Sequence, residues 1–117
     1  MIAPVYTTLS SASGVTAIVS DRIYRTQAKQ DTARPYIVWS VVSATPENTL
    51  ADRPEIDESR IQVDCYSESQ SQARALSDAA QYAIEGVANV VMGPLEFYEP
   101  DTMLYRFTFD AVFFTAR

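Results

Sequence analysis

Apolar residues recur at helical spacing through the middle of the chain. Between residues 69 and 87 they form one continuous stripe on a helix surface. Ser67 and Ser69 each stand three residues before a glutamine, which is the spacing of a capping box at a helix N-terminus. Gly86 suits the left-handed conformation that often ends a helix. The pattern predicts an amphipathic helix whose buried stripe is Ala73, Leu76, Ala80, Ala83, Ile84 and Val87.

Two shorter helical patterns open the chain. Pro4 fits the first turn of a helix because it lacks only an N–H that would be unpaired there, and apolar residues follow at helical spacing as far as Leu9. A second pattern ends at Val19, before Asp21, with Ser13 placed to cap its N-terminus. The sequence therefore predicts a broken helical start.

Two segments in the first half have the pattern of strands. Residues 36–43 are apolar and β-branched on both faces, and Pro35 holds the residue before it in an extended conformation, so this segment is expected to be a central strand. Residues 60–66 alternate, with Ile61, Val63 and Cys65 on one face and polar residues on the other. This alternation indicates a half-buried strand.

The last third of the chain predicts a hairpin. Its strands are residues 90–99 and 103–116, joined by a turn around Pro100 and Asp101. The second strand is long, and its alternation places the aromatic residues from Tyr105 to Phe113 on one face, with a mixed set on the other.

The order of elements predicts the fold. Helices, two or three strands, one long helix and two further strands are typical of an α+β protein with an antiparallel sheet of four to five strands and two main helices on one face. A length of 117 residues fits a single domain over residues 1–117. Residues 44–58 lack periodicity and carry two prolines and many charges, so we expect an extended loop or arm there.

Composition argues against several functions. The chain has no histidine and one cysteine, which excludes an internal disulfide and nearly every zinc, haem or iron–sulfur arrangement, and it suits a reducing compartment. We expect no cofactor. No apolar run is long enough to span a membrane, and the N-terminus lacks the pattern of a signal peptide. A net charge of −6 opposes tight binding of nucleic acid.

Catalysis has little support in the sequence. Without histidine, Ser-His-Asp and Cys-His arrangements are impossible, and the three glycines are too dispersed for a phosphate-binding loop. Asp64 and Asp110 lie within strands, where they suit a solvated or interface face better than an acid/base pair. The acidic run of residues 52–58 lacks the ligand spacing of a calcium loop. We therefore expect no enzyme activity, no metal site and no reactive role for Cys65.

Charge is segregated along the chain. Residues 22–34 are mainly basic, whereas residues 47–58 are mainly acidic. Two patches of opposite charge suit head-to-tail contacts between identical subunits. Two solvent-exposed loops without any role in subunit contacts would give the same charge pattern. The candidate interface or channel residues are Arg22, Arg25, Lys29, Arg34, Glu47, Asp52, Arg53, Glu55, Asp57 and Glu58.

The order of short motifs resembles one known family. DRIY, RPYIVW, TPENTL, IQVDCY and QARALSDAA follow one another from residue 21 to residue 80. Together they resemble the tail completion family of long-tailed bacteriophages, whose members are also called tail terminators or head-to-tail joining proteins. The resemblance extends over nearly the whole chain.

The resemblance implies a structural protein of the virion. It implies a homo-hexameric ring, and this ring could form only once the subunits are on the tail. The ring would lie at the junction of tail and head, and the protein would be made in the cytoplasm of the bacterial host. Its partners would be the tail tube protein and the head completion or connector protein, and DNA would pass through the ring without specific binding. The alternative is a small α+β protein-binding or regulatory module that forms no ring.

Overall fold

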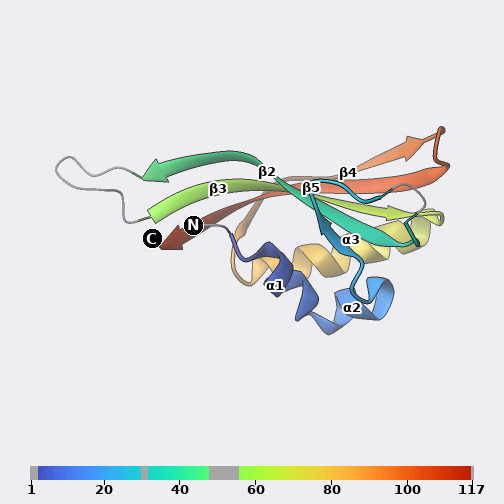
Figure 1. The fold of residues 1–117 in the computed structure, drawn as a ribbon, viewed down its shortest axis with the longest axis horizontal. Coiled ribbons are helices and arrows are strands. Elements are labelled where there is room, and N and C mark those ends of the chain that lie inside the picture. The colour runs from blue at the N-terminus through green and yellow to red at the C-terminus, as the bar shows by residue number, and fades with distance from the viewer. Residues whose placement is uncertain (1–2, 30–31, 48–55, 117) are drawn as a thin grey trace.

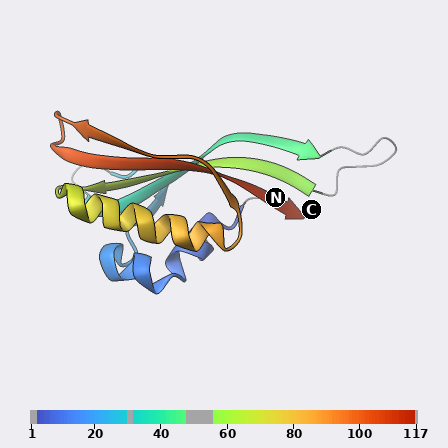
Figure 2. The same ribbon diagram turned by 180° about the vertical axis from the view of Figure 1, so that it is seen from behind.

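The protein has an α+β structure, and in the part of the chain that the structure describes three helices cover one face of a five-stranded sheet (Figures 1 and 2). The computed structural model describes residues 3–29, 32–47 and 56–116. The elements are α1 (Val5–Ser10), α2 (Ser13–Val19), β1 (Ile23–Arg25), β2 (Tyr36–Glu47), β3 (Ile56–Ser67), α3 (Gln70–Glu85), β4 (Asn89–Glu99) and β5 (Leu104–Ala116). The α+β class and the number of strands predicted from the sequence are confirmed.

The sheet is mixed, which corrects the expectation of a purely antiparallel one. The strand order is β1-β2-β3-β5-β4, and every pair is antiparallel except β1 with β2. β1 has only three residues, too few to show an alternating pattern in the sequence, and it pairs in parallel with the start of β2. Arg22 O accepts a hydrogen bond from Ile37 N at 3.0 Å, which fixes this register.

The strands β2 and β3 are longer than the sequence indicated. Residues 44–47 and 56–58 were expected in a loop, but they extend β2 and β3 by pairing with each other, and β3 also pairs with β5 as far as Ala116. At the Glu47 end of β2 the strand β1 is absent, so β2 is an edge strand there. An edge strand tolerates Pro46 because proline has no N–H to donate to a neighbouring strand. Residues 48–55, the rest of the expected arm, lie outside the described residues.

The long helix α3 confirms the predicted amphipathic helix except at its end, because Val87, which was expected in the stripe, lies beyond the helix and is 56% exposed. Its buried face includes Leu76, Ala80 and Ile84, each fully buried, and complete burial of an aliphatic side chain such as leucine stabilises the fold by about 1.5–3 kcal/mol. Ser69 caps the helix as predicted, since its Oγ accepts a hydrogen bond from the backbone N–H of Gln72 at 3.3 Å. The helix covers β3, β5 and β4.

Two predicted helix ends are wrong. Gly86 is right-handed, with φ −70° and ψ −19°, because the backbone continues in a further turn in which Val87 N and Ala88 N donate to Ile84 O. Ser13 lies inside α2 and does not cap it. Only two residues separate α1 from α2, so Ala12 takes the extended N-cap position instead.

The predicted C-terminal hairpin is confirmed as β4 and β5. The alternation of β5 is also confirmed, with Phe107, Phe109, Ala111 and Phe113 buried on the helix-facing side. Of these residues, Phe109, Ala111 and Phe113 join side chains from β2, β3 and the helices in one hydrophobic cluster. The opposite face of the sheet, called here the outer face, carries no helix in the part of the chain that the structure describes (Figure 1).

Candidate functional site

The basic residues of the segment 22–34 have different roles. Arg22 is half-buried, its Nε donates to Pro35 O at 2.8 Å, and its Nη2 donates to Ile18 O at 3.4 Å. This side chain therefore joins the helical layer to the start of β2 within the subunit. Arg25 is exposed, and its guanidinium lies 5.2 Å from the centre of the Trp39 ring, in cation–π geometry.

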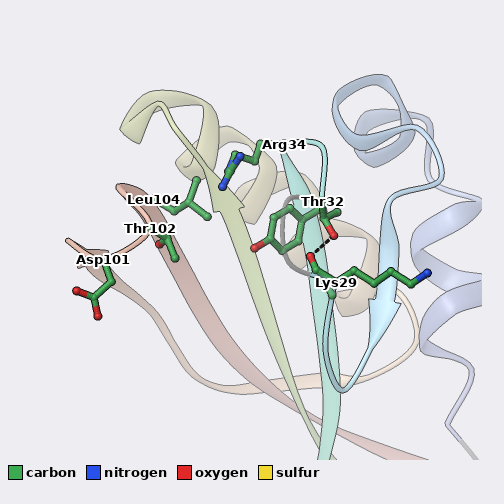
Figure 3. Close-up of a pocket in the computed structure, with 8 residues that line it drawn as sticks. Lys29, Thr32, Arg34, Asp101, Thr102 and Leu104 are labelled. Atoms are coloured by element: carbon green, nitrogen blue, oxygen red, sulfur yellow. Dashed lines mark hydrogen bonds between the residues drawn. The ribbon is translucent and has the colours of Figure 1, made fainter.

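Lys29 and Arg34 are exposed beside a shallow hollow of about 310 Å³ (Figure 3). Asp101 and Thr102, from the turn between β4 and β5, line the same hollow. Thr32 holds the loop by donating its hydroxyl to Lys29 O, and the Lys29 side chain extends away from Asp101. The hollow thus combines charges of both signs, which suits polar contact with a protein surface.

Only part of the acidic segment lies among the described residues. Asp57 and Glu58 are half-buried in β3, and Glu47 ends β2 opposite Ile56. Asp52, Arg53 and Glu55 lie outside the described residues. The described acidic positions are therefore strand residues held by backbone pairing.

The structure does not bring the basic and acidic segments together. β2 begins two residues after Arg34 and ends at Glu47, and its 12 residues span about 40 Å at 3.3 Å per residue. Figure 1 shows the two ends of β2 at opposite ends of the molecule. Contact between the two segments would therefore need a second molecule.

The two strand aspartates each have a basic partner on the outer face. Arg60 Nε lies 2.9 Å from Asp110 Oδ2, and Arg106 Nη1 lies 3.5 Å from Asp64 Oδ1. Gln62 also donates to the Asp64 carboxylate, at 3.2 and 3.3 Å. Asp64 and Asp110 are buried, so the expectation of a solvated face is wrong, and the basic partners offset part of the cost of burying these charges.

A pair of stacked tyrosines lies next to this network. The rings of Tyr36 and Tyr66 are 4.9 Å apart. Burial raises the pKa of the Tyr66 phenol, and the nearby Asp64 carboxylate raises it further. Both effects favour the neutral phenol, so this tyrosine is suited to packing and hydrogen bonding and not to proton transfer near neutral pH.

One exposed region was missed by the sequence reasoning. The hairpin strand β4 is an outermost strand of the sheet, and it exposes Val91, Leu95, Phe97 and Tyr98. The available signal was the absence of Lys and Arg from residues 75–105, combined with apolar residues on both faces of the predicted strand 90–99.

Within residues 3–29, 32–47 and 56–116, no group of three or more His, Cys, Asp or Glu side chains is placed to hold a metal ion. None of the helices in these ranges is long and apolar enough to cross a membrane.

Comparison with known proteins gives a consistent result. Residues 3–115 match the family described as "Tail completion protein gp17". Among solved structures, the chain is similar to one in "Virion of native gene transfer agent (GTA) particle", with a TM-score of 0.63, 14% identity and coverage of 95% of this chain and 92% of that one. It is also similar to "Structure of bacteriophage SPP1 gp17 protein", with a TM-score of 0.60, 15% identity and coverage of 97% and 86%. No curated protein sequence matches significantly.

Proposed function

Because this chain belongs to the phage tail completion protein family, its role is structural, and we propose that it caps the tail tube as a homo-hexameric ring. The ring ends polymerisation of the tube and presents the surface on which the head connector docks. The observation that carries this proposal is the family match over residues 3–115, which spans all the helices and nearly all of the sheet. No catalytic step is part of the role.

Tail assembly with and without the chain tests this function. Tube protein assembled in its absence is expected to give tubes of variable and excessive length, because nothing occupies the last tube ring. Added protein should fix the length and allow the tubes to join heads, both seen by electron microscopy. Tails of normal length that join heads without this chain would refute the proposal.

We also propose that the acidic end of β2 and β3 faces the channel through which DNA passes. This proposal is supported by the position of Asp57 and Glu58 at the end of the molecule farthest from the basic segment. Fixed negative charge beside the channel repels the phosphate backbone, so DNA slides through without being held. The basic residues Arg25, Lys29 and Arg34 are then left for contacts between subunits or with virion proteins.

Charge reversal tests the channel proposal. Asp57→Lys combined with Glu58→Lys should leave tail length normal but lower the yield of infectious particles, because DNA is retained on the basic ring. Since both residues also interact within the subunit, thermal unfolding must first show a folded variant. Asp21→Lys with Glu68→Lys makes the same change in charge at exposed positions elsewhere and is the control. Equal infectivity of the two variants would exclude the channel assignment.

A further inference from the structure

Residues 75–105 carry only negative charge and expose many large hydrophobic side chains. The segment contains no Lys or Arg. It provides seven of the eleven large hydrophobic side chains that are exposed among the described residues. Its acidic residues are Asp78, Glu85, Glu96, Glu99 and Asp101.

The fold places this segment along one edge of the sheet. β4 is the outermost strand, and α3 packs beside it, so the end of the helix adjoins the start of the strand (Figure 2). The name acidic edge is used here for Tyr82, Glu85, Val91, Leu95, Glu96 and Tyr98, all of them exposed.

The acidic edge contains a place that suits a guanidinium. Tyr82, whose side chain is 84% exposed, and Glu85 line a shallow hollow of about 450 Å³ at the end of α3. An aromatic ring next to a carboxylate is a favourable site for an arginine side chain, because the guanidinium stacks on the ring and pairs with the carboxylate. Neither Glu85 nor Glu96 makes an ion pair with another described residue. Both charges are therefore open to an outside partner.

The opposite edge of the sheet has the complementary character. β1 is the outermost strand on that side, and the name basic edge is used here for Arg25 and Lys29, which are exposed on β1 and just after it. Lys29 and Arg34 line the same hollow as Asp101, but the Lys29 side chain extends away from Asp101 (Figure 3), so only Arg34 is left out. Arg22 is left out because it is bound within the subunit. The partly buried Tyr24 adds aromatic surface beside Arg25, whose guanidinium lies over the ring of the buried Trp39.

We propose that the acidic edge of one subunit docks against the basic edge of the next copy of this chain. This inference rests on the proposed ring and specifies its subunit contact. The two surfaces differ and lie on opposite edges of one sheet, so the contact is heterologous and repeats from subunit to subunit, closing into a ring when the rotation allows.

Charge decides between this contact and a symmetric one. A two-fold contact between two acidic edges would bring Glu85 and Glu96 against the same residues of the partner, and like charges across an interface cost several kcal/mol. Contact between two basic edges fails for the same reason. The head-to-tail contact alone pairs opposite charges and also covers the apolar side chains of β4.

Two reciprocal variants test the proposed contact by sedimentation velocity at low ionic strength. The first is Glu85→Lys with Glu96→Lys, and the second is Arg25→Glu with Lys29→Glu. Each variant faces itself with like charges, so self-association should weaken by about a hundredfold relative to the unmodified chain. An equimolar mixture should recover association, because both contacts in an alternating ring then pair opposite charges. About 1 M salt, where the Debye length is about 3 Å, should reduce the difference between variants.

The outcomes separate this contact from the proposed function. The control variant, Asp21→Lys with Glu68→Lys, should associate like the unmodified chain. The contact is overturned if either reciprocal variant self-associates normally, if mixing gives no recovery, or if the unmodified chain stays monomeric up to about 1 mM. In each of these cases the tail-length assay still decides whether the chain completes tails.

Discussion

Gly93 in β4 is the position at which a single added methyl group should damage the fold most clearly. Its φ is +91°, and a Cβ built there would lie 2.6 Å from Thr108 O, 3.0 Å from Phe109 Cα and 3.1 Å from Phe109 Cβ. These are mostly backbone atoms of β5, which pairs on both sides with β3 and β4 and cannot easily move. Alanine would therefore have to displace β4.

The expected cost of Gly93→Ala has two parts. An L-residue in a left-handed conformation loses about 1–2 kcal/mol, and forcing a methyl group into an occupied site costs about 1–3 kcal/mol more. We therefore expect the free energy of unfolding to fall by about 2–5 kcal/mol, measured by urea denaturation at low protein concentration. Gly14→Ala, in α2, is the control. A Cβ at position 14 would lie 3.6 Å from Ala79 Cβ, which is an ordinary van der Waals distance. That variant should be up to about 1 kcal/mol more stable. A loss below about 1 kcal/mol for Gly93→Ala would refute the reasoning.

Four further predictions concern a helix cap, a buried thiol, a partly buried phenol and an ion pair. Ser69→Ala should lower the free energy of unfolding by about 1 kcal/mol in urea, because it removes the cap of α3. Burial raises the pKa of Cys65, so its thiol should react with a disulfide reagent at neutral pH only after unfolding. Burial also raises the pKa of Tyr66 above its usual value of about 10, so on raising the pH the unfolded chain loses the phenol proton before the folded chain does. The free energy of unfolding should therefore stay constant with respect to this group below about pH 10 and fall above it, and the fall should be smaller in Tyr66→Phe. Arg60→Ala should cost about 1–2 kcal/mol by leaving Asp110 partly buried without its cation, and Asp110→Asn should recover part of that loss in a double-mutant cycle.

The elements that the sequence predicted well are those whose signal is local. The apolar stripe of α3 and its Ser69 cap lie within one helix, and the hairpin of β4 and β5 is set by its own alternation and turn. Both are confirmed with boundaries shifted by one or two residues. Local patterns suffice there because the interacting residues are close in the chain.

The elements that could not be predicted depend on distant partners. The extension of β3 to Ile56 is stabilised by pairing with β5 some 60 residues later, where Ala116 lies opposite, and this overrides the polar, proline-containing sequence. The strand β1 has three residues and exists only because β2 runs beside it. Gly86 would permit a left-handed stop, but the further turn through Val87 and Ala88 that leads into β4 keeps it right-handed.

The candidate site was predictable in its charges and not in its contacts. Segregation of charge can be read along the chain, but Arg22 donates to two carbonyls of its own subunit, and this depends on how α2 meets β2. Likewise, the exposure of Leu95 and Phe97 follows from the place of β4 at the edge of the sheet, which no local pattern fixes.

The irregular path of β4 connects the stability of the fold with the proposed subunit contact. Its pairing with β5 shifts register between Val90 and Met92 and again between Met92 and Leu95, around Gly93. Bulges and a proline interrupt the backbone edge that another strand would need, and they are devices by which edge strands avoid uncontrolled pairing. The side chains of the acidic edge stay exposed all the same. β4 is therefore suited to side-chain docking and poorly suited to strand addition, which agrees with a contact chosen by charge. A milder replacement at position 93 that leaves the chain folded should accordingly weaken self-association, because Leu95 and Glu96 move with the strand.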